Sequence, residues 1–230
     1  MKIARRVLGM LAGISMLVIL LITSFEIGAY SDYNWYKKEY EKYDVLAELE
    51  MRMDDVMEVT KEMMSYLRGN RENLVVQTVV NGEEQEFFNA REKAHMIDVK
   101  HLFLGGLWLR RGAVISLVVA IIVLIKKEEK WMKRLAKSML WTFGIFILAT
   151  AGAGLLFFSD FNKYFTLFHE VFFTNDLWLL DPRTDLLIRM LPEGFFFDMV
   201  ARIGIIFLAL MFAVVIISIT VLIRQSNKKN

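Results

Sequence analysis

Two histidines, each inside a dense motif next to an apolar stretch, are the residues best suited to chemistry in this sequence. His95 lies in Glu92-Lys93-Ala94-His95-Met96-Ile97-Asp98-Val99, and His169 lies in Phe168-His169-Glu170-Val171-Phe172-Phe173. An unperturbed imidazole gains and loses its proton near neutral pH. Because the chain has three histidines and sets two of them beside apolar sequence, the pattern indicates proton transfer on a lipid.

The composition indicates a membrane protein. Apolar residues make up 56% of the chain and the mean hydropathy is +0.40. Four apolar runs account for the excess: Val7 to Phe25, Leu102 to Ile125, Ser138 to Phe158 and Ile203 to Ile223. As a helix rising about 1.5 Å per residue, each can cross a hydrocarbon core of about 30 Å. We therefore predict a membrane α-helical fold with four transmembrane helices, the first of which remains as an anchor.

The distribution of charge predicts the orientation. The N-terminus, the 126–137 loop and the C-terminal tail are basic, whereas segment 30–100 has ten basic and sixteen acidic residues and segment 159–198 has three and seven. The positive-inside rule then places both termini in the cytoplasm and both long loops outside.

Six parts follow along the chain. We expect a cytoplasmic N-terminus and first transmembrane helix (1–29), a small extracellular α+β cap (30–101), a second transmembrane helix with a basic inner loop (102–137), a third transmembrane helix (138–158), an extracellular aromatic loop (159–198), and a fourth transmembrane helix with a cytoplasmic tail (199–230).

Local residue patterns predict secondary structure in the two outer segments. Apolar residues at steps of three and four predict one amphipathic helix over Tyr40–Leu67, and Asn81-Gly82 predicts a β-hairpin that packs on it. In the second outer segment, aromatic spacing predicts an amphipathic or re-entrant helix over Asn162–Phe173 at the lipid interface. Asp181-Pro182 predicts the start of a short helix that ends at Met190.

Charged residues near the second span are candidates for substrate binding. Too few residues separate Arg111 from Ile125 to cross the membrane, so Arg110 and Arg111 must lie below the outer surface. Arg110 either snorkels to the headgroups or faces a partner, and Arg111 is a candidate for holding a lipid carbonyl or phosphate oxygen. Asp98, three residues after His95, is a candidate to orient the imidazole.

Other functions remain open on the residues alone. The chain has no cysteine, which excludes thiol catalysis, disulfides and thiolate metal sites. A metal-dependent membrane hydrolase would use His95, His101 and His169, although no zincin motif is present. A non-enzymatic membrane module that binds a partner through its outer cap is the other alternative. We expect no metal, no other cofactor and no nucleic-acid partner.

Three longer motifs resemble those of the lipoprotein intramolecular transacylase (Lit) family of Gram-positive bacteria. They are Phe87-Phe88-Asn89-Ala90-Arg91-Glu92-Lys93-Ala94-His95-Met96-Ile97-Asp98-Val99, Phe168-His169-Glu170-Val171-Phe172-Phe173-Thr174-Asn175-Asp176-Leu177-Trp178-Leu179-Leu180-Asp181-Pro182 and Asp185-Leu186-Leu187-Ile188. The resemblance implies that His95 and His169 are catalytic. It also implies a reaction at the outer leaflet of the cell membrane, in which the sn-2 acyl chain of a diacylglyceryl lipoprotein moves to the amine of its N-terminal Cys, giving a lyso-form lipoprotein.

Imidazole chemistry is compatible with that reaction. An α-amine has a pKa of about 7.7 to 8.0, so a base that works near neutral pH can prepare it for attack. Amine and ester belong to one molecule, so holding it folded supplies proximity without an acyl-enzyme. One histidine would act as base and the other would protonate the departing glycerol oxygen, with Arg111 stabilising the oxyanion. Which histidine does which, and whether an acyl-imidazole forms, stay open at this point.

Overall fold

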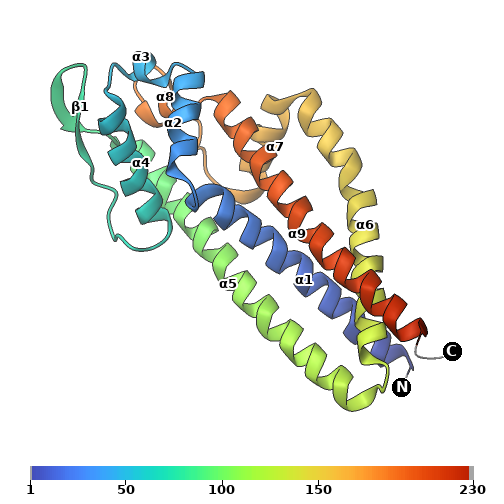
Figure 1. Cartoon of the computed structure of the whole chain (residues 1–230). Helices are drawn as coiled ribbons and strands as arrows, with labels where there is room; N and C mark the ends of the chain where they lie inside the picture. Colours follow the sequence, from blue (N-terminus) through green and yellow to red (C-terminus); the bar gives the residue numbers. More distant parts are fainter. Residues whose placement is uncertain (1, 228–230) are drawn as a thin grey trace. The chain divides into compact units, whose positions relative to one another are not determined.

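A computed structural model describes the backbone of residues 2–227 and their side chains except those of 2, 153–159 and 161. In chain order the elements are α1 (Lys2–Tyr30), α2 (Tyr33–Lys42), α3 (Val45–Leu49), α4 (Met53–Leu67), β1 (Gln77–Val80), β2 (Glu83–Glu86), α5 (Ala90–Lys127), α6 (Trp131–Ser159), α7 (Phe161–Phe172), α8 (Leu186–Met190) and α9 (Glu193–Asn227). Figure 1 shows these elements along the chain. They form two compact units. Unit 1 holds residues up to 27, 107–159 and from 202 on, and unit 2 holds 28–106 and 160–201.

Four of the helices are long and apolar enough to cross a membrane. They cover Ile3–Tyr30, Ala90–Lys127, Trp131–Gly152 and Glu193–Asn227, so each contains most or all of one predicted apolar run. Helices are suited to this environment because every backbone donor and acceptor is satisfied within the segment. The prediction of a helical protein with four membrane helices and a small two-stranded sheet is confirmed.

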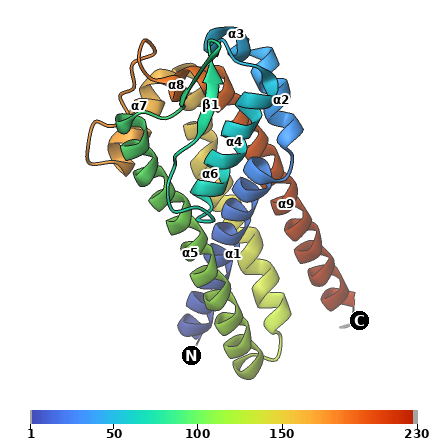
Figure 2. The same cartoon turned by 90° about the vertical axis from the view of Figure 1, so that its left-hand side faces the viewer.

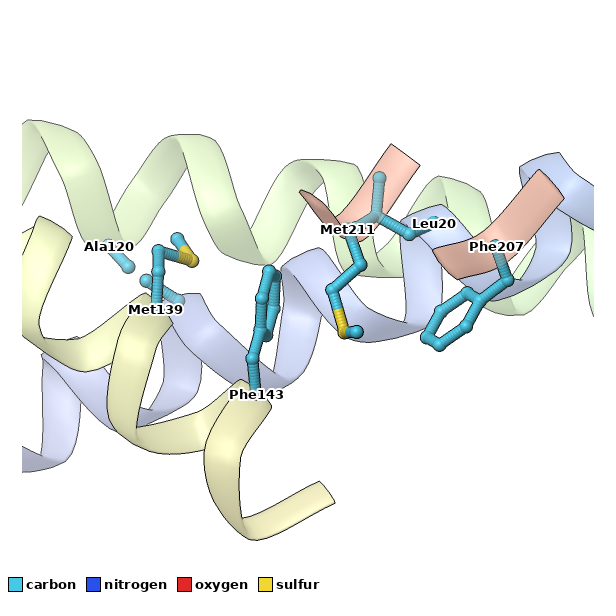
Figure 3. Close-up of a cluster of buried hydrophobic side chains, with 7 residues drawn as sticks. Leu20, Ala120, Met139, Phe143, Phe207 and Met211 are labelled. Atoms are coloured by element: carbon cyan, nitrogen blue, oxygen red, sulfur yellow. The ribbon is translucent and has the colours of Figure 1, made fainter. Parts of the chain in front are cut away.

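Unit 1 is a bundle of helices around a narrow apolar core. Figure 3 shows side chains from α1, α5, α6 and α9 that meet there, among them Leu20, Ala120, Phe143 and Phe207. Outside this core, large apolar side chains such as Leu148 remain mostly exposed within the unit. A soluble protein rarely leaves so much apolar surface uncovered. In a membrane, lipid tails cover these side chains.

Close packing of α1 against α6 depends on two glycines one helical turn apart. A Cβ atom on Gly9 would lie 2.2 Å from Oγ of Ser138, and one on Gly13 would lie 2.2 Å from Oγ1 of Thr142. Two small residues at a spacing of four let helix backbones approach closely in a membrane. Any larger residue would push the two helices apart.

The basic segments lie at one end of unit 1. Figures 1 and 2 both place the start of α1, the connection from α5 to α6 and the end of α9 at the same end of the bundle. This is the arrangement that four membrane crossings require. Lys228 and Lys229, which belong to the predicted basic tail, lie outside the described residues.

The single helix predicted over Tyr40–Leu67 is wrong, because the segment folds as α2, α3 and α4 in unit 2. The backbone breaks at Asp44 and Glu50, which both adopt left-handed conformations with φ of 52°. Each short helix keeps its apolar face buried, and Tyr40 of α2 contacts α4 through a 2.7 Å hydrogen bond to Thr60. The apolar residues face the core within each helix, as their spacing predicts. The chain turns at Asp44 and Glu50, where the sequence has no glycine or proline.

The β-hairpin predicted around Asn81-Gly82 is present. β1 and β2 pair antiparallel, with Val80 opposite Glu83. Asn81 and Gly82 have φ of 53° and 78°, as expected for the two-residue turn that matches strand twist. β1 packs against α4, and the amide of Asn81 donates to the carbonyl of Glu50 at 3.0 Å. This hydrogen bond connects the break between α3 and α4 to the hairpin turn, so each stabilises the other.

The predicted helix start at Asp181-Pro182 is also wrong. Residues 182–184 form a turn, and α8 begins at Leu186 after Asp185. The Asp181 carboxylate accepts hydrogen bonds from the guanidinium and backbone N–H of Arg183, and the Arg183 guanidinium lowers the Asp181 pKa to about 2. The Asp side chain thus stabilises a tight turn, which competes with helix capping for the same residue type.

Candidate functional site

The helix that carries His95 begins with a reciprocal cap. The Asn89 side-chain oxygen accepts from the backbone N–H of Glu92 at 3.0 Å, and the Glu92 carboxylate accepts from the backbone N–H of Asn89 at 2.7 Å. Two donors that a helix start leaves unsatisfied are thereby paired. The cap fixes where α5 begins and therefore the direction in which His95, two turns later, projects.

The same glutamate joins α5 to the segment that follows α7. Glu92 is fully buried, and its second carboxylate oxygen accepts from the backbone N–H of Leu187 at 2.6 Å. The Asn89 amide donates to Asp185 at 2.7 Å, and the other Asp185 oxygen accepts from the backbone N–H of Asp181 at 2.7 Å. We call these three hydrogen bonds, together with the two of the cap between Asn89 and Glu92, the Glu92 latch. It links the two sequence motifs that carry the histidines.

His95 and His169 lie together inside unit 2. Their ring centroids are 6.1 Å apart, with an angle of 36° between the planes, and both residues are 7% exposed. Phe173 packs against both, with its ring centroid 5.4 Å from that of His95 and 5.5 Å from that of His169. Two imidazolium rings at this separation would repel each other. The pair is therefore suited to holding one proton at a time.

His169 is held in one orientation by its own helix. Its Nδ1 lies 2.7 Å from the carbonyl oxygen of Phe165, and because a carbonyl can only accept, Nδ1 carries the hydrogen. Phe165 and Trp178 cover the ring, with centroids 4.1 Å and 4.8 Å away. Burial lowers the pKa of His169 below its usual value of 6.5, opposed by the bond to Phe165. Near neutral pH the residue is a neutral imidazole whose Nε2 lone pair is available as a base.

His95 has an unused polar atom. Its Nδ1 is buried and has no hydrogen-bond partner among the described residues. Asp98, the candidate for orienting this ring, instead accepts a 2.8 Å hydrogen bond from the side chain of Asn175. A buried ring nitrogen without a partner is costly, so His95 Nδ1 is suited to a hydrogen bond with another group.

A small cavity opens beside the two histidines. Its volume is about 200 Å³, and it is lined by Asp98, His101, Leu102, Phe172, Phe173, Thr174 and Asn175. Phe173 is shared with the histidine pair, so the cavity is one aromatic ring away from both imidazoles. A larger hollow of about 510 Å³ follows the polar face of α7, but neither catalytic candidate lines it. The smaller cavity is therefore the one next to the two histidines.

The remaining charged candidates lie in unit 1. Arg110 forms an ion pair with Glu26 of α1, so it faces a partner, which was one of its two expected roles. The Arg111 guanidinium lies 4.5 Å from the centroid of the Trp108 ring, and Trp108 is 67% exposed. Arg stacked on an exposed Trp is typical of a membrane interface.

His101 is exposed and lines the small cavity, whereas His95 and His169 are buried. Among the residues whose placement is described, no group of three or more His, Asp or Glu side chains is arranged to hold a metal ion. The three histidines named in the metal hypothesis are thus not gathered into one ligand set within that part of the chain.

Sequence reasoning missed several residues of the site. Glu92, Asn175 and Trp178 stand in the quoted motifs, but nothing in their spacing predicted a role. Trp178 covers His169, and its indole N–H donates to the carbonyl of Asn175 at 3.0 Å. The useful signal was the density of polar and aromatic residues around each histidine, which marks a segment whose side chains contact one another.

Comparisons with known proteins agree with this geometry. The family model for the lipoprotein intramolecular transacylase Lit matches residues 10–196. A solved structure of the membrane integral lipoprotein intramolecular transacylase Lit from Bacillus cereus is 20% identical, with a TM-score of 0.78, over 98% of this chain and 99% of that one. A structure of the same Bacillus cereus protein with one histidine replaced by arginine is 19% identical, with a TM-score of 0.76, over 100% and 96%.

No curated protein matches the sequence significantly. The solved structures share the fold at low identity, and the family model covers most of the chain. With four membrane helices and a family match that includes both histidine motifs, this multi-pass membrane protein belongs to the lipoprotein intramolecular transacylase Lit family.

Proposed function

We propose that this protein moves the sn-2 acyl chain of a diacylglyceryl lipoprotein to the α-amine of its N-terminal Cys, leaving a lyso-form lipoprotein, on the extracellular side of the cell membrane. The observation that carries the proposal is the meeting of His95 and His169 at 6.1 Å. They come from two different helices, and both are buried where an ester and an amine could be held away from water.

His169 is the general base in this proposal. With Nδ1 committed to the Phe165 carbonyl, only Nε2 can take a proton, and burial keeps the ring neutral. Efficient acid–base catalysis needs a group whose protonation state is correct at the working pH. The deprotonated amine then attacks the ester carbonyl carbon and forms a tetrahedral intermediate.

His95 handles the second proton. A substrate that arrives as an ammonium ion must lose two protons to become an amide, whereas the glycerol oxygen gains one. The ammonium loses its first proton to water before attack. His169 takes the second proton during attack, and His95 passes that proton to the glycerol oxygen as the carbon–oxygen bond breaks, so the pair holds one proton at a time. The sum is one amide, one alcohol and one released proton, and no acyl-enzyme is required.

Exposed apolar side chains on α7 are the surface proposed to meet the acyl chains. Leu167, Phe168, Val171 and Phe172 are 43% to 69% exposed and follow one another at helical steps. A helix with such a face lies in the membrane interface. Arg111 is the proposed contact for a lipid carbonyl or phosphate oxygen.

The orientation proposed for the site follows from charge. The basic segments gather at one end of unit 1, which the positive-inside rule assigns to the cytoplasm. His95 and His169 stand in the two acidic segments that four crossings place on the opposite side. A lipoprotein anchored in the outer leaflet can reach them there.

Mass spectrometry of a lipoprotein N-terminus tests the function. The chain is expressed in a bacterial host that lacks such an enzyme, and a lipoprotein is purified with and without it. We expect an N-acyl, S-monoacylglyceryl Cys only in the presence of the chain, with the total number of acyl carbons conserved between one N-linked and one O-linked chain. Loss of an acyl chain as free fatty acid would instead favour a hydrolase.

A further inference from the structure

The cavity beside the histidines has a polar wall that the catalytic steps leave unassigned. Asp98 contributes a carboxylate, of which Oδ2 accepts from Asn175 at 2.8 Å. Within the described part of the chain this is the one hydrogen bond made to Asp98, and no Lys or Arg pairs with it. Its Oδ1 therefore remains available for a cationic donor.

Asn175 is itself fixed. Its side-chain oxygen accepts from the backbone N–H of Leu177 at 3.1 Å, and its carbonyl accepts from the indole of Trp178 at 3.0 Å. Trp178 in turn stacks on His169. The orientation of the Asp98 carboxylate is thereby tied, through Asn175 and Trp178, to the ring of the proposed base.

Asp98 also lies close to the proposed acid. It stands three residues after His95 on α5, so the two side chains share one face of the helix. His95 Nδ1 is buried without a partner in the described chain. A donor group bound at Asp98 would be next to a nitrogen that needs a hydrogen bond.

The size of the cavity selects what can enter. A volume of about 200 Å³ is below the range of about 300–1,000 Å³ that is usual for whole ligands. Two long acyl chains do not fit, whereas a compact polar group does. Leu102, Phe172 and Phe173 supply apolar walls. The polar walls come from Asp98, His101, Thr174 and Asn175.

We propose that this cavity is the subsite for the α-ammonium group of the substrate, which binds the Asp98 carboxylate held by Asn175. The inference rests on the proposed function and deepens it, because it names the part of the lipoprotein that is recognised. A charge-assisted hydrogen bond to a carboxylate is among the strongest polar contacts in proteins. It would select mature lipoproteins with a free N-terminus and deliver the ammonium beside His95.

A binding experiment with analogues that cannot react separates recognition from chemistry. The first analogue is a cysteinyl peptide carrying a thioether-linked glycerol with two ether-linked alkyl chains, so no ester is present. The second is identical but lacks the α-amine. We expect the purified wild-type protein in detergent to bind the amine analogue about ten- to a hundred-fold more tightly than the des-amino one. Equal dissociation constants for the wild type would overturn the proposal.

Substitutions at Asp98 test whether this carboxylate causes the tighter binding of the amine analogue. Asp98→Asn should reduce the ratio of the two dissociation constants to about two or less, and Asp98→Glu should keep most of it, because the charge remains. Asp176→Asn, an exposed carboxylate in the following segment, is the matched control and should leave the ratio unchanged. A full preference in Asp98→Asn would place the ammonium elsewhere. If that variant does not fold, Asp98→Ser takes its place, and a full preference in Asp98→Ser would count against the cavity in the same way.

The same measurement distinguishes failure of this inference from failure of the proposed function. His169→Gln should bind both analogues like the wild type but convert no ester substrate. A wild-type protein that discriminates the analogues but never produces the lyso-form would refute the transacylase function and leave an ammonium site. A wild-type protein that produces the lyso-form without discriminating would refute only the site.

Discussion

The carbonyl oxygen of Phe165 lies 2.7 Å from Nδ1 of His169, one turn later in α7. This contact decides which nitrogen of the imidazole carries hydrogen, so the proposed base is oriented by its own helix rather than by a carboxylate partner. In functional histidines the second ring nitrogen is often held by a carboxylate or by a backbone carbonyl. Here the Phe165 carbonyl orients the His169 ring. A side-chain substitution at Phe165 would not remove this hydrogen bond.

Replacing either His95 or His169 with Gln should abolish lyso-form production while the protein still inserts. Loss of one general acid or base costs about 10² to 10⁴ in rate, and groups that act as a unit are not additive. The double variant should therefore be little worse than either single one. His101→Gln should retain most activity.

The measurement is the ratio of lyso-form to diacyl lipoprotein at matched expression. Normal conversion by His95→Gln together with an inactive His101→Gln would show that the wrong histidine has been chosen.

Conversion should persist at pH values where a free histidine is already protonated. Burial lowers the His169 pKa below 6.5, so the neutral base survives below that pH, and the acidic limb of kcat should lie lower than 6.5. Trp178→Ala, which uncovers the ring, should move this limb upward, whereas Trp141→Ala, at a position 73% exposed in unit 1, should not. A limb above 6.5 in the wild type would contradict the assignment of His169 as the base.

The free energy of unfolding should also depend on the protonation of His169, and the direction of this pH dependence can be predicted. The unfolded chain binds a proton at this histidine with a pKa near 6.5, and the folded chain binds it only at lower pH. Between these two values the unfolded state holds more protons, so the free energy of unfolding should decrease as the pH falls below about 6.5. In His169→Gln this part of the decrease should be absent, as measured by thermal unfolding across pH 5 to 8. An unchanged slope in the variant would assign the pH dependence to other groups.

Glu92→Gln should lower both stability and conversion. The buried carboxylate accepts from two backbone N–H groups, those of Asn89 and Leu187, whereas an amide offers one oxygen and turns an N–H toward the other donor. One unsatisfied buried donor costs about 1–3 kcal/mol, which corresponds to a decrease in Tm of about 5 °C in a chain of this size. Glu84→Gln, on the exposed strand β2, is the control. A Glu92→Gln variant with normal Tm and normal activity would show that the Glu92 latch does not position the site.

Neutralising Lys228 and Lys229 together should leave conversion intact. Their charge is explained by orientation alone, and the proposed substrate lies on the other side of the membrane. Conversion is measured as for the histidine variants, with insertion checked by the accessibility of the outer loops to protease. A large loss of conversion with normal insertion would implicate the cytoplasmic tail in the reaction.

The sequence predicted the membrane helices, α7 and the β-hairpin well, because each has a strong local signal. Apolar runs longer than a membrane, aromatic residues at helical steps and the Asn81-Gly82 pair all act within a few residues. The break of the cap helix at Asp44 and Glu50 has no such signal. The Glu50 carbonyl is held by Asn81 in the hairpin turn, and a contact so distant along the chain overrides local propensity.

The site was predictable in its histidines but not in their support. Motif density singled out His95 and His169, and the family resemblance gave them a role. The Glu92 latch and the bond from Asn175 to Asp98 join residues that lie far apart in the sequence, and a single sequence contains no signal for such pairs. The turn at Asp181 was missed because Asp is equally suited to starting a helix and to closing a turn.

The ion pair between Glu26 and Arg110 has a consequence for biogenesis. The two residues are 84 positions apart, so when α1 leaves the ribosome the segment that will carry its partner has not been synthesised. An ionisable residue near hydrocarbon is costly until it is paired. Glu26 therefore gains its Arg110 partner only after the cap and the start of α5 have been translated.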